Sequence, residues 1–409
     1  MTATADAGAA APAQPDPPGL LDALALLAEV GDQLVLASVR DTHVAVERRV
    51  HGLLRRPTGG AVRGPELAHR AIAGTVYGSI SAGLRVAGAG LDAAADAAAA
   101  RGRRGEARDP LLDDDPRGRF LRAAVNGLIG DRLDVERPRM ALPLTVRVDG
   151  RDVPPTREGL AAAYPGAGGR VAVLLHGLCE DEQAWGLHRA RRGTTYAEEL
   201  TADGWTVVLL RANTGLGLRP GGAALSALLQ RVVDAWPVPV ERLALVGHSL
   251  GGLLFRAAGA VASDAEAPWA ARVSNVVTLG TPHLGAPLAQ YVGHGARALA
   301  RVPETAAFGR ILDWRSRGVH DLVDGLAEDV PPLPHARYHL VSATLTRSPR
   351  HPVGASLGDV LVRHPSAHGR GRGGRRLFPR GDVLHVPAAD HFDLLNHADV
   401  AEALRAWLA

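Results

Sequence analysis

The sequence contains a single cysteine, Cys179, and no lysine among its 46 basic residues. One cysteine excludes an internal disulfide and any cysteine-based metal cluster, and it fits a reducing compartment. All basic residues are therefore arginine, and the formal net charge is only +3. So small an excess, without a broad basic footprint, excludes nucleic acid as the expected partner.

Long apolar runs and targeting signals are also missing. No stretch of about 18 uncharged apolar residues occurs, so a transmembrane helix is not expected. Residues 1–18 have neither the basic nor the apolar segment of a secretory signal, and their Ala/Pro-rich composition predicts a disordered lead-in. We therefore expect a cytoplasmic protein, a location that also allows peripheral attachment to a membrane.

Aromatic residues make up only 4% of the chain, but its 46% hydrophobic content is sufficient for a globular core. Residues 19–140 have the apolar spacing of helices, one of them over 20–39 and a second opened near Pro65. The Ala- and Gly-rich residues 76–100 predict a helix that packs closely on another helix or, alternatively, lies on a membrane surface. We treat 19–140 as an N-terminal helical region.

From residue 141 to 409 the pattern changes. A hairpin is expected around Asp149-Gly150, and apolar strands then alternate with helices. This alternation predicts an α/β fold with a mostly parallel sheet and helices on both faces. In such sheets functional residues follow the carboxyl ends of the strands. The expected strands are 171–175, 205–210, 243–246, 273–279, 338–341 and 384–386.

The strand expected at 243–246 runs into Gly247-His248-Ser249-Leu250-Gly251, which an apolar, small-residue helix follows. This order fits the G-x-S-x-G nucleophile elbow. Ser249 is expected to have a strained backbone, and side chains at Gly247 and Gly251 would collide with the neighbouring strand and helix. Ser249 then lies at a helix N-terminus, which favours negative charge. The alternative is a tight turn whose serine only caps the helix.

The segment His176-Gly177-Leu178 directly follows the strand expected at 171–175. A tetrahedral intermediate needs two hydrogen-bond donors aimed at its oxyanion. In this architecture one donor is the backbone N–H after the nucleophile, at Leu250, and the other comes from the loop after an earlier strand, where Leu178 is the candidate. We interpret His176 as a buried hydrogen-bonding residue of this loop rather than as a base.

The general base is expected late in the chain, and His391 follows the last predicted strand, from where its imidazole can reach the serine. His385 lies in that strand, and His397 falls in the following helical segment, which favours a structural role. His248 flanks the nucleophile and usually points away from it. His283 lies at the correct edge of the sheet, where we expect it to line or brace the site.

A third group must orient the imidazole and stabilise its charged form. Asp359, in a long loop before His391, is the candidate, and it gives the order Ser249, Asp359, His391. Asp382 precedes the last strand and would lie at the opposite end of the sheet. Asp390 is adjacent to the histidine and poorly placed to accept from its ring. The alternative role for Asp359 is an Asx turn.

The segments VLLHGL, GHSLGG, GTPHLGAP, GDVLV and DHFDLLNH occur in this order. With them, residues 140–409 resemble the lipase and esterase part of the α/β-hydrolase superfamily, and look most like bacterial lipases and GPI inositol-deacylase-like hydrolases. The resemblance implies that fold, and its catalytic assignments agree with those made from the residues. The implied residues are Ser249 as nucleophile, His391 as base, Asp359 as acid, and Leu178 and Leu250 as oxyanion donors.

Some bacterial lipases bind a structural calcium through an aspartate two residues after the catalytic histidine, where this sequence has Asp393. The neighbouring ligand is usually Gln, but His397 stands there, and no second aspartate is identifiable. We therefore predict no metal and no organic cofactor.

Residues 286–335 interrupt the alternation with two helix-like segments that have apolar faces. We expect a helical lid there, because lids exclude water and present apolar surface to a substrate. The alternative is a crossover helix with a long loop. The Arg-rich loop 368–380 is expected to be solvated, and its alternative role is contact with anionic headgroups or an acidic substrate.

Together these patterns predict a serine hydrolase that cleaves carboxylic esters, of the lipase/esterase type, through an acyl-enzyme. A thioesterase or acyltransferase would use the same triad. A protein of another class, which binds a lipid surface or a partner without catalysis, would place that role in the N-terminal helices. The expected partners are a small-molecule or lipid ester and, peripherally, a membrane.

Overall fold

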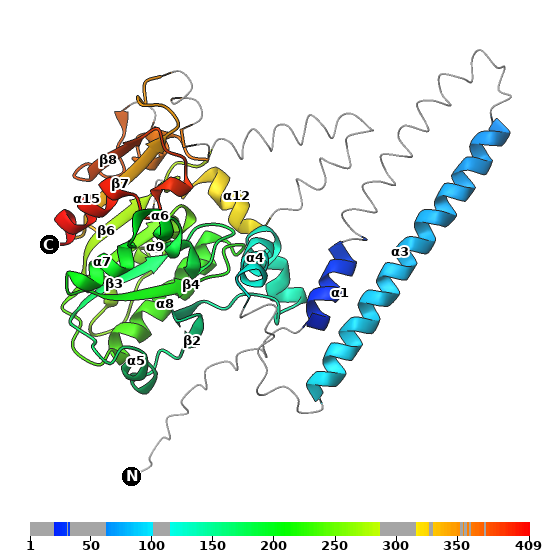
Figure 1. Ribbon diagram of the computed structural model, residues 1–409, viewed down its shortest axis with the longest axis horizontal. Helices are drawn as coiled ribbons and strands as arrows, with labels where there is room; N and C mark the ends of the chain where they lie inside the picture. Colours follow the sequence, from blue (N-terminus) through cyan, green and yellow to red (C-terminus); the bar gives the residue numbers. More distant parts are fainter. Residues whose placement is uncertain are drawn as a thin grey trace, which may run out of the picture.

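The computed structural model describes residues 20–30, 32, 63–100, 115–286, 316–326, 330–351, 355, 358–359, 361–371 and 374–409. Its centre is an eight-stranded sheet in the order β2-β1-β4-β3-β5-β6-β7-β8 (Figure 1). Strands β3 to β8 are parallel, and β1 is antiparallel to both β2 and β4. The predicted mostly parallel sheet is confirmed. The strands are β1 (Thr145–Val148), β2 (Arg151–Val153), β3 (Arg170–Leu175), β4 (Thr206–Arg211), β5 (Arg242–His248), β6 (Val273–Leu279), β7 (Arg337–Thr344) and β8 (Asp382–Pro387).

The hairpin of β1 and β2 turns where the sequence predicts. Asp149 and Gly150 both have positive φ, 48° and 70°. A two-residue turn with positive φ at both positions matches the twist of the strands it joins, and Asp-Gly is among the sequences that adopt it at least cost. The antiparallel edge of the sheet is thus set by local chemistry.

Each central strand is buried on both faces. In β3, Val171 and Val173 join one hydrophobic core while Ala172 and Leu174 join the other. Because side chains alternate across a strand, continuous burial requires helices on both faces. Helices α5 (Arg157–Ala163), α8 (Leu218–Ala235) and α9 (Leu250–Gly259) cover the first face, and α7 (Tyr196–Ala202) and α15 (Ala398–Leu408) cover the second. The shorter helices are η3 (Glu182–Gly186), α6 (Arg189–Arg192), η4 (Trp269–Arg272), α12 (Arg317–Asp324), α14 (His364–Ala367) and η6 (Phe392–Leu394).

The N-terminal helices are α1 (Leu20–Val30), α3 (Arg63–Ala100) and α4 (Pro116–Glu136). The first two pack along each other, and Gly88 of α3 lies against Ala25 and Ala28 of α1 (Figure 1). The predicted close helix packing through small residues is confirmed. None of the helices in the described ranges is long and apolar enough to cross a membrane. Residues 1–18 and the 33–39 end of the first expected helix lie outside the described residues.

Helix α4 packs on the sheet domain, although its sequence belongs to the N-terminal helical pattern. A Cβ added to Gly127 would clash with Cys179, and Asn213 donates from Nδ2 to the Gly130 carbonyl at 2.9 Å. Cys179 lies in the loop after β3, and Asn213 lies in the loop after β4. The division of the chain near residue 140 stays a prediction, and these contacts tie α4 to the loops at the edge of the sheet.

The lid expected over 286–335 lies largely outside the described residues. Its described helix, α12, is fastened to α4 and to the loop after β4. Ser316 donates from Oγ to the Gly127 carbonyl at 2.6 Å, and the Gly318 N–H donates to the Gly215 carbonyl at 3.0 Å. The C-terminal end of the predicted lid therefore adjoins α4.

Candidate active site

Ser249 lies at the sharp turn between β5 and α9, with φ 51° and ψ −120°. This conformation is strained for a residue with a side chain, as the sequence predicts. Side chains at Gly247 and Gly251 would clash with the backbone of Gly252 and of Leu175, respectively. The G-x-S-x-G glycines are therefore required by close approach, and the nucleophile elbow predicted from the sequence has the expected geometry.

The loop after β3 approaches the serine directly. A Cβ built on Gly177 would lie 2.9 Å from the Cβ of Ser249, so only glycine fits between the loop and the elbow. Among the described residues, no hydrogen bond uses the backbone N–H of Leu178 or of Leu250. Donors without partners beside a candidate nucleophile are suited to receive an oxyanion. We name residues 176–180 the oxyanion loop.

His176 is wholly buried in this loop, and both of its ring nitrogens are used. Nδ1 lies 2.9 Å from the Gly177 carbonyl, and Nε2 accepts from the Ala212 N–H at 3.1 Å. The first contact requires a hydrogen on Nδ1 and the second a lone pair on Nε2, so the two partners fix the tautomer of the ring. The structure confirms a buried hydrogen-bonding role for His176.

Asp359 and His391 meet although 32 residues separate them. Asp359 Oδ2 accepts from His391 Nδ1 at 2.8 Å, and the His391 N–H donates to the Asp359 carbonyl at 3.0 Å. The other carboxylate oxygen accepts from the Leu361 and Val362 N–H groups at 3.0 and 2.7 Å. Asp359 therefore makes both contacts considered for it. One carboxylate oxygen closes an Asx-type turn, and the other accepts from the imidazole.

Burial and charge act in opposite directions on His391. Burial lowers the pKa of this imidazole, but the negative charge of Asp359 and its hydrogen bond outweigh burial and leave the pKa raised. The imidazole also adjoins the elbow, because a Cβ on Gly280 would lie 3.0 Å from its Cε1 and the preceding Leu279 carbonyl accepts from the Ser249 N–H at 2.8 Å. Its position and its pKa suit a general base.

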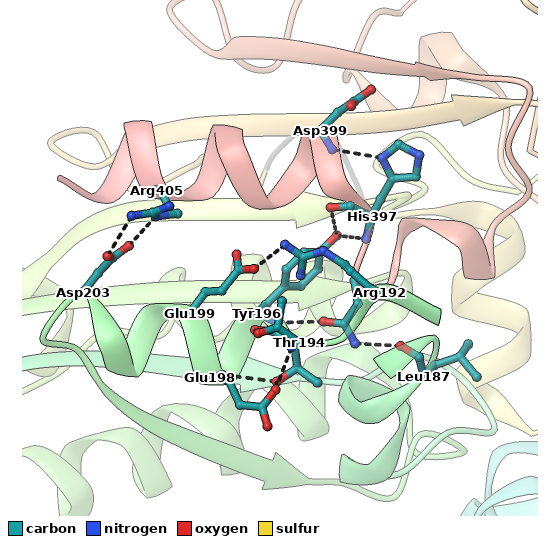
Figure 2. A network of polar contacts seen from close by, with 12 residues as sticks. Leu187, Arg192, Thr194, Tyr196, Glu198, Glu199, Asp203, His397, Asp399 and Arg405 are labelled. Carbon is teal, nitrogen blue, oxygen red and sulfur yellow. Dashed lines mark hydrogen bonds and ion pairs between the residues drawn. The ribbon is translucent and has the colours of Figure 1, made fainter. Parts of the chain in front are cut away.

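The segment that carries His391 is tied to α7. Tyr196 donates its hydroxyl hydrogen to the Leu394 carbonyl at 2.7 Å. The same hydroxyl accepts from the His397 N–H at 2.7 Å (Figure 2). Asn396, with φ 61°, donates from its side chain to the carbonyls of Trp185 and Leu187. His397 caps α15 through its side chain, so it precedes that helix rather than lying within it. This network fixes the chain that follows His391.

The remaining candidate histidines and aspartates have other partners. His283 is buried against Phe378, and its Nε2 lies 3.3 Å from Thr278 Oγ1, so it braces the core. Asp382 begins β8 and pairs with His339 of β7 at 3.0 Å, at the opposite end of the sheet as predicted. The others are His385, beside Thr344; Asp390, which accepts from backbone N–H groups; and Asp393, beside Arg191.

A metal has no evident binding site in the ranges that the structure describes, where no group of three or more His, Cys, Asp or Glu side chains is arranged to hold one. Asp393, considered for calcium from the sequence, accepts from the Asp390 N–H at 3.0 Å and lies 3.4 Å from Arg191. Burial raises the pKa of the Cys179 thiol to about 11, which disfavours the reactive thiolate at neutral pH.

Glu180 is a residue of the site that the sequence does not reveal. Its carboxylate accepts from the Gly177 N–H at 2.6 Å and lies 2.9 Å from His248 Nδ1. Nothing local distinguishes Glu180 from Asp181 and Glu182, which follow it. Its one signal is its position in the loop after β3, four residues beyond His176.

Residues 168–311 match the family described as "Putative serine esterase (DUF676)". Among solved structures the chain is similar to Bacillus licheniformis lipase BlEst2 in mature form, at 20% identity over 59% of this chain and 92% of that one, with a TM-score of 0.41. It is also similar to EstA from Clostridium botulinum, at 14% identity over 59% of this chain and 88% of that one, with a TM-score of 0.39. A third similar structure is carboxylesterase CesB from Bacillus subtilis, at 14% identity over 71% of this chain and 97% of that one, with a TM-score of 0.36.

The family match supports ester hydrolysis as the reaction, and it covers the oxyanion loop and the elbow. The mostly parallel sheet with its antiparallel edge, the strained serine after β5 and this match together assign the chain to the α/β-hydrolase superfamily.

Proposed function

We propose that this protein hydrolyses carboxylic esters through an acyl-enzyme formed on Ser249, with His391 as general base and Asp359 as the orienting acid. One observation carries the proposal: a buried imidazole, hydrogen-bonded to a buried carboxylate at 2.8 Å, adjoins a serine held in a strained elbow. A serine hydroxyl is a weak nucleophile, and a histidine oriented by a carboxylate is the arrangement that activates it.

In the first half-reaction, Ser249 Oγ attacks the ester carbonyl carbon and its proton passes to His391 Nε2. The C–O bond to the alcohol then breaks, and His391 returns the proton to the leaving alcohol. In the second half-reaction, water attacks the acyl-enzyme, gives a proton to His391 and releases the carboxylic acid as Ser249 regains its proton. Asp359 stabilises the imidazolium in both halves.

The backbone N–H groups of Leu178 and Leu250 bind the oxyanion in each tetrahedral intermediate. The second lies at the first turn of α9, where the helix dipole adds to its effect. All steps need only these groups and water. The same triad would serve a thioesterase or an acyltransferase, so assays with a thioester and with acceptor alcohols decide between these reactions and hydrolysis.

Covalent labelling tests the nucleophile. A fluorophosphonate probe should label the wild-type protein once, and Ser249→Ala should abolish the label. Ser263→Ala, in an exposed loop, serves as the matched control and should label normally. Labelling that survives Ser249→Ala would falsify the assignment. A series of p-nitrophenyl esters of rising chain length then defines the acyl group.

We also propose that a lipid surface contacts α3. Arg85 is the one charged residue between positions 71 and 91. Large apolar side chains of the helix are nonetheless exposed, as expected for a helix that lies on lipid. They are Leu67, Val76, Ile80 and Val86.

Sedimentation with anionic phospholipid vesicles tests this contact. Wild-type protein should co-sediment, and the double variant Val76→Asp/Val86→Asp should not. Val261→Asp, at an exposed valine of the sheet domain, is the control. Equal sedimentation of all three proteins would contradict the proposal.

A further inference from the structure

A second carboxylate–histidine pair adjoins Ser249, formed by Glu180 of the oxyanion loop and His248 of β5. The same carboxylate oxygen, Oε2, lies 2.9 Å from His248 Nδ1 and accepts from the Gly177 N–H at 2.6 Å. A Cβ on Gly177 would contact this oxygen, the His248 ring and Ser249 together. The pair therefore meets the oxyanion loop and the elbow at one point.

The other side of the His248 ring faces the catalytic histidine. His248 Nε2 lies 3.3 Å from the His391 carbonyl oxygen, and the two imidazole rings lie 4.8 Å apart. A carbonyl oxygen and an ionised carboxylate can only accept hydrogen bonds. The form of His248 that satisfies both contacts is the imidazolium, which carries a hydrogen on each ring nitrogen.

The charge of Glu180 agrees with that requirement. Burial raises the pKa of this carboxyl, but the charge of His248, their hydrogen bond and the Gly177 N–H outweigh burial and bring the pKa to about 2. His248 is wholly buried. A buried cation is stable only beside a compensating charge and hydrogen-bond acceptors, which Glu180 and the His391 carbonyl supply.

We propose that Glu180 and His248 form a buried carboxylate–imidazolium ion pair that positions the oxyanion loop and the His391 backbone relative to Ser249. Glu180 holds the Gly177 amide, one residue before the Leu178 donor, and His248 holds the main chain of the base. Both are positioning residues, since neither touches the reacting atoms. This inference deepens, and rests on, the proposed esterase function.

The pair ties together two parts of the site that must keep their spacing to within a fraction of an ångström. The oxyanion donor and the base come from loops after β3 and β8, which are not neighbours in the sheet. A misplacement of about 1 Å can cost an enzyme on the order of 10²-fold in rate. Loss of the ion pair should therefore lower turnover more than substrate affinity.

Steady-state kinetics test the positioning role. Glu180→Gln and His248→Gln should each lower kcat roughly 10- to 100-fold and change KM less than about threefold. The double variant should lose little more than either single variant, since both act through one pair. Glu182→Gln is the matched control, because this carboxylate lies two residues away but pairs with Arg147, and the variant should keep wild-type kcat despite a lower Tm.

Ring ¹⁵N NMR tests the ion pair without an activity assay. The signals of His248 are identified as those missing from His248→Gln. At neutral pH they should report two protonated nitrogens in the wild-type protein and in Ser249→Ala. In Glu180→Gln, where the His391 ring, its carbonyl and Phe392 still face His248 but the carboxylate is gone, they should report a neutral ring.

A neutral His248 ring in the wild-type protein, or a Glu180→Gln variant with kcat within twofold of wild type, overturns the inference. Failure of the esterase proposal looks different, because fluorophosphonate labelling would then survive Ser249→Ala. The NMR result would still decide whether the ion pair exists.

Discussion

Two carboxylate–histidine pairs flank the same serine, and they differ in what the second ring nitrogen does. In both, a carboxylate lies within 2.9 Å of Nδ1; that of Asp359 is buried, and that of Glu180 is 11% exposed. His248 also uses Nε2, against the His391 carbonyl, whereas no hydrogen bond from the described residues occupies Nε2 of His391. A carboxylate partner thus orients an imidazole, but a nitrogen left open for a proton is what makes it a base.

Substitution of each histidine is the strongest test of this difference. His391→Gln should reduce kcat/KM by roughly 10⁴-fold or more, because no group remains to take the serine proton. His248→Gln should lower kcat only roughly 10- to 100-fold, because it removes a positioning contact. Both rates come from p-nitrophenyl ester hydrolysis, with folding checked by circular dichroism. Equal losses would mean that the two pairs do not have separate roles.

Substitution of the catalytic acid should have the next largest effect. Asp359→Asn should lower kcat roughly 10³- to 10⁴-fold, because the amide favours the wrong tautomer of His391. Asp382→Asn is the control at the opposite end of the sheet, beside His339, and should change kcat less than twofold. A comparable loss in both variants, or a loss only in Asp382→Asn, would assign the acid role elsewhere.

The pH dependence of kcat/KM tests the Asp359–His391 pair through a smaller effect, a shift of the midpoint. His391 must be neutral to accept a proton, and Asp359 keeps the pKa of His391 raised despite burial. Activity should therefore rise with pH through a midpoint above the value of about 6.5 for a free imidazole. In Asp359→Asn the residual activity should reach its midpoint at a lower pH. An unchanged midpoint would show that Asp359 does not set the protonation of the base.

Substitution of two glycines should have the smallest effects on kcat. Gly177 lies against the Glu180–His248 pair, and Gly280 lies against His391. Gly177→Ala crowds Ser249 and the Glu180–His248 pair, and Gly280→Ala crowds His391 at a φ of 59°. We expect each to lower kcat roughly tenfold by displacing catalytic groups. Gly280→Ala should also lose about 1–2 kcal/mol of unfolding free energy, because a side chain disfavours the left-handed region. Urea denaturation measures this loss, and a stability equal to wild type would contradict the stated strain.

Much of the fold was predictable because the signals are local. Asp149-Gly150 adopts the turn that its residues favour, and the apolar strands match the predicted ones within a few residues. The elbow was predictable for the same reason, since Gly247, Ser249 and Gly251 meet their steric constraints within one turn. Helix α8 begins at Leu218, and Pro220 is tolerated there because it lies in the first turn of the helix.

The partners of Glu180 and of α4 were not predictable. Glu180 reaches His248 across 68 residues, and His248 reaches the His391 carbonyl across 143. Gly127 of α4 allows Cys179 to pack closely against the helix, but in the sequence it resembles any other small residue of a helical pattern. Such contacts depend on which loops the sheet brings together, and no local pattern encodes that.

The sequence by itself determined a parallel sheet, a strained serine and the chain order of its candidate partners, because periodicity, steric fit and strand ends are local properties. Only the tertiary structure decided that, within the described part of the chain, His391 leaves Nε2 open while His248 uses both of its ring nitrogens. That choice depends on acceptors that the fold brings from distant segments, the Asp359 carboxylate to His391 and the His391 carbonyl to His248. Two histidines with similar neighbours in space can therefore have different roles at one serine.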